Sequence, residues 1–232
     1  MPYIKHFFLT SATILAITIT SLNAQNIVSF DSSYTNTYYS QKVSHFKSLP
    51  DTKNEIIFLG DSISDSGEWT ELLPNYTTKN RGVSSDNTYG VLARLDEVTN
   101  AKPAKIFILI GVNDIARNIP TKIILKNYSQ IIERIKNESP TTQIYVQSLF
   151  PTNNHYMEYK GHQNKGDKIL ALNKGLKDLA ATKKAQFVDL YTHFADNEGK
   201  LPLDYTHDGL HLNGAAYIKW AKFLTDEGFL NQ

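Results

Sequence analysis

Apolar residues gather in four short runs along the chain, at residues 56–59, 106–110, 144–146 and 187–190. Because these runs are nearly continuous rather than alternating with polar residues, they are typical of β-strands that are covered on both faces. A weaker strand is expected around residues 77–80. The pattern therefore predicts five strands in a sheet with two buried faces.

Other segments carry apolar residues at helical spacing, which predicts helices between the strands and after the last one. Their apolar faces are formed by Val91, Leu92, Leu95 and Val98, by Ile124, Tyr128, Ile131, Ile132 and Ile135, by Ile169, Leu172, Leu176 and Leu179, and by Tyr217, Trp220 and Leu224. We expect Asp86 to cap the first of these helices, Asn213 to cap the last, and Gly228 to end it. Strands that alternate with helices indicate a parallel sheet between two helical layers, a three-layer α/β/α sandwich.

Residues 1–24 are predicted to be a cleaved export signal rather than part of the fold. Lys5 and His6 form a short basic region, residues 7–19 are mostly apolar, and Ala24 can precede a cut before Gln25. An uncleaved anchor is the alternative, although the stretch is short of the ~20 apolar residues that a membrane span needs. We therefore expect an exported protein, periplasmic or secreted, in which residues 25–232 form a single domain.

The composition excludes several classes of function. The 232 residues include 24 Lys and Arg against 23 Asp and Glu, a formal charge of +1. This balance offers no basic face for nucleic acid or anionic membranes. Because the chain has no cysteine, disulfides, thiolate nucleophiles and cysteine-ligated zinc are excluded as well.

Reactive residue types stand where the predicted strands end. Ser62 follows the first strand, Gly82 the weak strand and Asn113 the next one, while Asp208 and His211 come just before the last helix. In parallel sheets of this class, ligands bind beyond the carboxyl ends of the strands. We therefore expect these residues to meet at one edge of the sheet, where together they supply the groups that acyl transfer requires.

Each of the five has an expected role in that reaction. A serine hydroxyl needs a neighbouring base, and the base needs an orienting acceptor, so Ser62, His211 and Asp208 form a candidate triad. The candidate donors to the oxyanion are the backbone amides of Ser62 and Gly82 and the side-chain NH2 group of Asn113. Each motif taken alone is also ordinary turn or cap chemistry. Their joint occurrence at strand ends favours catalysis.

This set resembles the SGNH hydrolases, also called the GDSL esterase/lipase superfamily, whose four blocks are centred on Ser, Gly, Asn and His in this order. Ser62, Gly82, Asn113 and His211 match them, and the resemblance extends from about residue 55 to the last helix. It implies a flavodoxin-like sandwich, ester hydrolysis without metal or cofactor, and Asp208 as the third triad member.

Residues near Ser62 and Gly82 indicate which branch of the family the chain resembles. Ile63 stands where the family name has Leu, a change between branched apolar residues that leaves the chemistry untouched. Residues 67–69 and 80–82 resemble the branch similar to platelet-activating-factor acetylhydrolase, which favours short acyl groups. Trp69 is a candidate to stack on a sugar ring or to cover the sheet, and Arg81 a candidate for substrate contact or a salt bridge.

Two further sets of polar residues receive other interpretations. Asp61 and Asp114 are expected to be structural. His207 and His211 have a spacing that suits zinc on a helix. They precede the helix, however, and no third ligand is evident, so no metal is expected.

The substrate follows less directly from the sequence. Residues 150–166 are polar and aromatic, and no long apolar insertion is present that could bury a fatty chain. Exported relatives in the family often remove acetyl groups from sugars, which implies a carbohydrate O-acetylesterase acting on sialic acid or a polysaccharide. A lysophospholipase or short-chain lipase, and a non-catalytic glycan-binding module, are the alternatives.

Overall fold

Five parallel strands form one sheet in a computed structural model that describes residues 1–3, 30–156 and 158–231. The strands are β1 Ile56–Gly60, β2 Thr78–Gly82, β3 Lys105–Leu109, β4 Gln143–Gln147 and β5 Gln186–Val188, in the order β2-β1-β3-β4-β5. The predicted α/β fold is confirmed. Because the order reverses at β1, the topological switch point lies between β1 and β3, where such sheets hold ligands.

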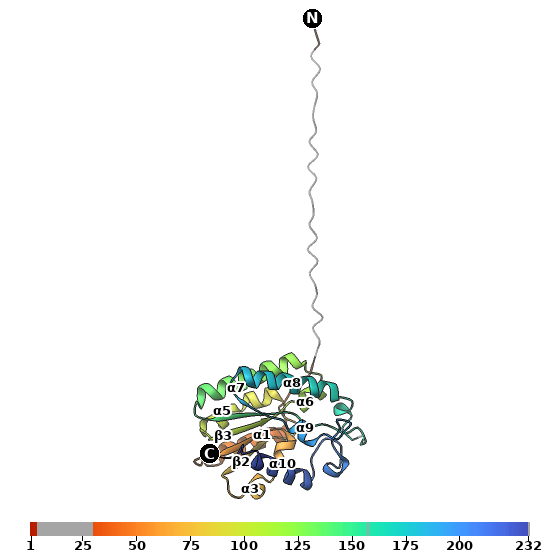
Figure 1. Cartoon of the computed structure of the whole chain (residues 1–232). Helices are drawn as coiled ribbons and strands as arrows, with labels where there is room; N and C mark the ends of the chain where they lie inside the picture. The colour runs from red at the N-terminus through yellow and green to blue at the C-terminus, as the bar shows by residue number, and fades with distance from the viewer. Residues whose placement is uncertain (4–29, 157, 232) are drawn as a thin grey trace.

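Helices cover both faces of the sheet (Figure 1). They are α1 Thr37–Ser48, α2 Ser62–Asp65, α3 Trp69–Leu72, α4 Thr88–Ala93, α5 Leu95–Asn100, α6 Val112–Ala116, α7 Thr121–Glu138, α8 Gly166–Thr182, α9 Leu190–Phe194 and α10 Gly214–Asp226, with 3-10 turns η1 Lys160–His162 and η2 Leu203–Tyr205. In Figure 1, α5, α7 and α8 lie on one side of the sheet, and α3 and α10 on the other.

The predicted export signal falls mostly on residues 4–24, outside the described ranges, and stays a prediction. Within the described ranges, no helix is both long and apolar enough to cross a bilayer.

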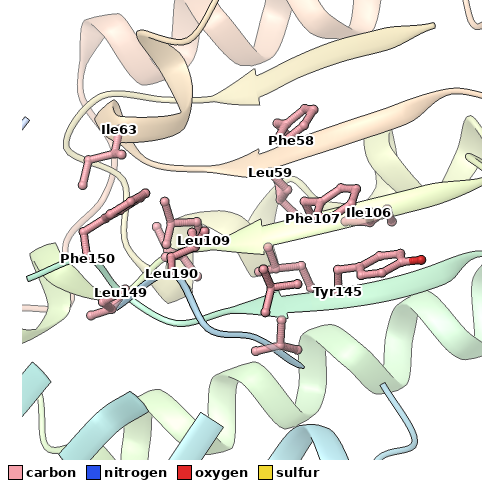
Figure 2. Packing of buried hydrophobic residues seen from close by; sticks show 14 of the residues in the cluster. Phe58, Leu59, Ile63, Ile106, Phe107, Leu109, Tyr145, Leu149, Phe150 and Leu190 are labelled. Atoms are coloured by element: carbon pink, nitrogen blue, oxygen red, sulfur yellow. The ribbon is translucent and has the colours of Figure 1, made fainter. Parts of the chain in front are cut away.

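Aromatic rings from neighbouring strands stack across the middle of the sheet (Figure 2). The strand register pairs Phe58 with Phe107 and Phe107 with Tyr145, and the ring centroids are 5.3 and 4.4 Å apart. Figure 2 also shows Ile63 and Phe150 beyond the carboxyl ends of the strands, where they extend the core towards that edge of the sheet. Each fully buried side chain of this size contributes about 1.5–3 kcal/mol.

Arg94 is a buried cation that ties the ends of two strands together. Its guanidinium donates to the carbonyls of Gly60 in β1 and Arg81 in β2, at 3.0 and 2.9 Å, and pairs with Asp86 at 2.9 Å. The loops that follow both strands are therefore fixed relative to each other.

The ion pair with Arg94 also corrects the predicted start of a helix. Asp86 does not cap α4; Asn87 does, by accepting hydrogen bonds from the N–H groups of Tyr89 and Gly90. The predicted single helix is divided into α4 and α5 at Arg94. In contrast, Asn213 caps α10 as predicted.

Candidate active site

Ser62 begins a short helix directly after the first strand. Asp61 caps that helix, because its Oδ1 accepts the N–H of Ile63 at 3.0 Å. The turn is packed tightly against the sheet: a Cβ on Gly60 would collide with the carbonyl of Leu109, and one on Gly82 with the backbone of Asp65. Glycine at these two places lets β1, β2 and β3 hold Ser62 at the carboxyl edge.

Ser62, His211 and Asp208 lie together in a chain of hydrogen bonds. Ser62 Oγ is 2.9 Å from His211 Nε2, and His211 Nδ1 is 2.7 Å from Asp208 Oδ2. The other oxygen of Asp208 accepts the backbone N–H groups of Leu210 and His211, at 2.8 and 2.7 Å. Residues separated by 149 positions in the sequence are thus placed in the geometry of a nucleophile, a base and an orienting acid.

The Asp208 carboxyl is held in its ionised form. Burial raises its pKa, but the hydrogen bonds from the N–H groups of Leu210 and His211 and from the His211 ring outweigh burial. The net pKa of Asp208 is therefore lower than usual, and a carboxylate faces His211 at neutral pH.

Asn113 lies at the start of α6, just after β3. Its Nδ2 donates to the carbonyl of Asp86 at 2.9 Å, and its Oδ1 is 3.0 Å from His162 Nε2. Since an amide nitrogen carries two hydrogens, one N–H of Asn113 is left for an oxyanion.

The Gly82 amide is not free to serve as the second predicted donor. It donates to Asn80 Oδ1 at 2.9 Å, which corrects the role expected for Gly82. Ser85 is the better candidate, because its backbone N–H makes no hydrogen bond in the part of the chain that the structure describes. Its φ of +65° turns the backbone just before Asp86, the residue that holds Asn113. Because residue 85 is a serine, no glycine marks this left-handed turn in the sequence.

Trp69 and Arg81 are both buried, so of the alternatives that the sequence left open the structure supports a place against the sheet for Trp69 and a salt bridge for Arg81, not contact with substrate. Trp69 is 2% exposed, its ring stacks on Phe58 at 3.6 Å and its Nε1 donates to the carbonyl of Ser64. Arg81 is equally buried and pairs with Glu97 at 2.6 Å. Both side chains stabilise the sheet around the site.

Two residues of the polar loop after β4 contact the candidate catalytic groups instead. Tyr159 packs its ring edge-on to His211, with centroids 5.1 Å apart, and His162 contacts Asn113. The polar and aromatic composition of residues 150–166 identified this loop as a candidate substrate-contacting segment, but it did not distinguish these two side chains from the others.

Two buried carboxyls lie beneath the site with raised pKa values. Burial raises the pKa of Asp61 to about 7 and that of Asp114 to about 6. Asp114 bonds to Thr88, whereas Asp61 Oδ2 has no partner among the described residues. Both are structural in position, as expected, and Asp61 is poorly suited to carry a charge.

We expect the free energy of unfolding of the Asp61→Asn variant to rise relative to that of the wild-type protein as the pH increases. Between pH ~4 and about 7 only the unfolded wild-type chain loses the Asp61 proton, so its free energy of unfolding falls as pH rises. The asparagine carries no charge to bury and can still accept from Ile63. Chemical denaturation should show that the variant gains on the order of 2 kcal/mol over wild type between pH 5 and pH 8. An unchanged difference between the two pH values would contradict a raised Asp61 pKa.

Cavities near the catalytic groups are small. The hollow bounded by Asp61, Ile63, Leu149 and Leu210 has a volume of about 10 Å³, room for one water molecule. A cavity of about 530 Å³ lies at the opposite edge of the sheet, where three strands begin. Within the described residues, no group of three His, Asp or Glu side chains is arranged to hold a metal ion.

Comparison with known proteins places the chain in a family. Residues 58–218 match the GDSL-like Lipase/Acylhydrolase family, so the chain belongs to it, as the resemblance to SGNH hydrolases predicted. The protein is a carboxylic ester hydrolase, in agreement with relatives that are named as esterases and acetylhydrolases.

The chain is similar to several known proteins, one of them with a solved structure. A protein from Streptococcus pneumonia described as a platelet activating factor is 31% identical, with a TM-score of 0.75 over 83% of this chain and 91% of that one. The platelet-activating factor acetylhydrolase IB subunit alpha1 of Bos taurus is 22% identical over 75% of each chain. An arylesterase of Vibrio mimicus is 32% identical over 43% of this chain and 56% of its own.

Proposed function

We propose that the protein hydrolyses short acyl esters, with Ser62 as nucleophile, His211 as general base and Asp208 as the residue that orients His211. The observation that carries this proposal is the unbroken chain of hydrogen bonds, 2.9 Å from Ser62 to His211 and 2.7 Å from His211 to Asp208.

In the first half of the reaction, Ser62 Oγ attacks the ester carbonyl carbon while its proton passes to His211 Nε2. The carbonyl oxygen becomes an oxyanion, which is stabilised by the free N–H of Asn113 and by the backbone N–H groups of Ser62 and Ser85. The bond to the alcohol then breaks, and the alcohol leaves with the proton from His211.

In the second half, water attacks the acyl-enzyme. His211 takes a proton from that water, a second oxyanion forms at the same donors, and its collapse releases the acid and restores the Ser62 hydroxyl. The Asp208 carboxylate stabilises the His211 imidazolium in both halves.

We propose an acetyl group on a carbohydrate as the substrate. The one-water hollow beside Ser62 offers no enclosed space for a long chain. The neighbouring rim carries polar and aromatic side chains, including Asn154, His155, Tyr156 and Tyr159. The acetylhydrolase and lipase names of relatives support a lipid ester of short acyl chain as the second candidate.

An acyl-chain and acetate-release panel tests the substrate. We expect kcat/KM on p-nitrophenyl esters to fall from acetate to octanoate, and acetate to be released from O-acetylated sialic acid, acetylated xylan or acetylated peptidoglycan. The Ser62→Ala protein is the blank. Rates that rise towards octanoate, without release from any of the three carbohydrates, would favour the lipid candidate and reject the carbohydrate substrate.

A further inference from the structure

The Asn113 carboxamide is held at both of its ends. The Asp86 carbonyl can only accept a hydrogen bond, so the amide nitrogen of Asn113 must face it, at 2.9 Å. This places Oδ1 towards His162 Nε2, 3.0 Å away. Because Oδ1 can only accept, the neutral His162 ring must carry its proton on Nε2.

The surroundings of His162 keep its ring neutral. Burial is the main cause that lowers its pKa to about 4, and the positive charges of His211, Lys165 and Arg117 lower it further, against a smaller opposite effect of Asp208. A neutral ring adds no net charge next to the His211 imidazolium that forms during turnover.

The loop that carries His162 is attached to both halves of the candidate site. Asn153 N–H donates to the carbonyl of Gly209, between Asp208 and His211, at 2.8 Å. At the other end of the loop, Gly161 packs on Ala116 of α6, the helix that carries Asn113. The side chains of Asn154 and Asn164 bond to each other at 3.1 Å and close the segment between these contacts.

From these contacts we infer that His162 is a positioning residue, which holds the Asn113 amide so that its free N–H points to the oxyanion; this rests on the proposed function. Without His162, the Asp86 carbonyl alone would restrain the amide. Donation into Oδ1 also polarises the carboxamide and strengthens its N–H as a donor.

Kinetics of variants on p-nitrophenyl acetate test this role. We expect His162→Leu to lower kcat about tenfold with little change in KM, less than the 10²–10³ expected for loss of the Asn113 donor itself. His162→Gln, whose amide N–H can take the place of Nε2, should restore most of the loss. His45→Leu is the control, because His45 is an exposed histidine on α1 and is not part of the loop that carries His162.

A double-mutant cycle separates positioning from a general structural effect. In the Asn113→Ala background, His162→Leu should cause no further loss, because the group that it positions is gone. Equal losses in both backgrounds, with unchanged thermal unfolding, would overturn the inference.

The tautomer gives a readout that does not depend on activity. Nitrogen NMR of the histidine rings should show His162 neutral at pH 6 with its proton on Nε2. A proton on Nδ1, or a ring already charged at that pH, would overturn the inference. Hydrolysis that survives Ser62→Ala would instead reject the proposed triad, and the NMR result would still decide whether His162 donates to Asn113.

Discussion

Ser62→Ala is expected to reduce kcat on p-nitrophenyl acetate by about 10⁶-fold, to the level left by binding and oxyanion stabilisation alone. Among the described residues, the hydroxyl removed is the only group that hydrogen-bonds to His211 Nε2, at 2.9 Å. Alanine fits the same space, and the Ser62 hydroxyl makes no other hydrogen bond among the described residues, so the fold should be unchanged.

Thermal unfolding and initial rates on the same preparations check this expectation. Ser84→Ala is the matched control, because Ser84 lies in the loop after β2 and its hydroxyl makes no hydrogen bond in the described ranges. Turnover by the Ser62 variant close to that of the control would show that another group is the nucleophile. An unfolded Ser62 variant would contradict the expected structural neutrality of the change.

The part of the site on the strand ends was predictable from the sequence. Continuous apolar runs identify buried parallel strands, and the carboxyl ends of such strands share one edge. Ser62 and Asn113 follow two neighbouring strands, so their proximity required no knowledge of side-chain packing. The close approach of His211 was expected from its place just before the last helix together with the base that a serine nucleophile needs, and the family pattern agreed with it.

Features that depend on contacts distant in the sequence were not predictable. α1 was missed because only Tyr39 and Phe46 of its 12 residues are buried, too few to give a periodic signal. These two residues form a small separate cluster with Val83. Tertiary packing, not local pattern, makes this segment a helix.

The hydrogen bonds of polar residues depend on the fold in the same way. The sequence leaves Arg81 between substrate contact and a salt bridge, and the fold decides for the salt bridge with Glu97, 16 positions away. Gly82 was chosen as an oxyanion donor for its flexible backbone, but the neighbouring Asn80 side chain occupies its N–H. The residue types show which hydrogen bonds are possible, and only the fold decides which of them form.

Asp208→Asn is expected to lower kcat by about 10⁴-fold, because the variant would hold His211 in the wrong tautomer. Oδ1 of Asp208 accepts the N–H groups of both Leu210 and His211, so an oxygen must stay at that position. The new NH2 group therefore replaces Oδ2 and donates to His211 Nδ1. The His211 proton then moves to Nε2, the ring nitrogen that faces Ser62. With a proton already bound, Nε2 cannot accept the proton of the Ser62 hydroxyl.

The same geometry predicts that the Asp208→Asn protein folds, since both backbone N–H groups keep their acceptor. Rates on p-nitrophenyl acetate check the expected loss of activity, and nitrogen NMR of the His211 ring checks the expected change of tautomer. Asp204→Asn, at an exposed position on the same segment, is the matched control and should keep the wild-type rate. The variant could instead keep the wild-type tautomer and lose no more than about tenfold in kcat, far less than a misoriented triad predicts. In that case Asp208 would not be the residue that orients His211. Another group at the same edge of the sheet would then have to accept the Nδ1 proton of His211.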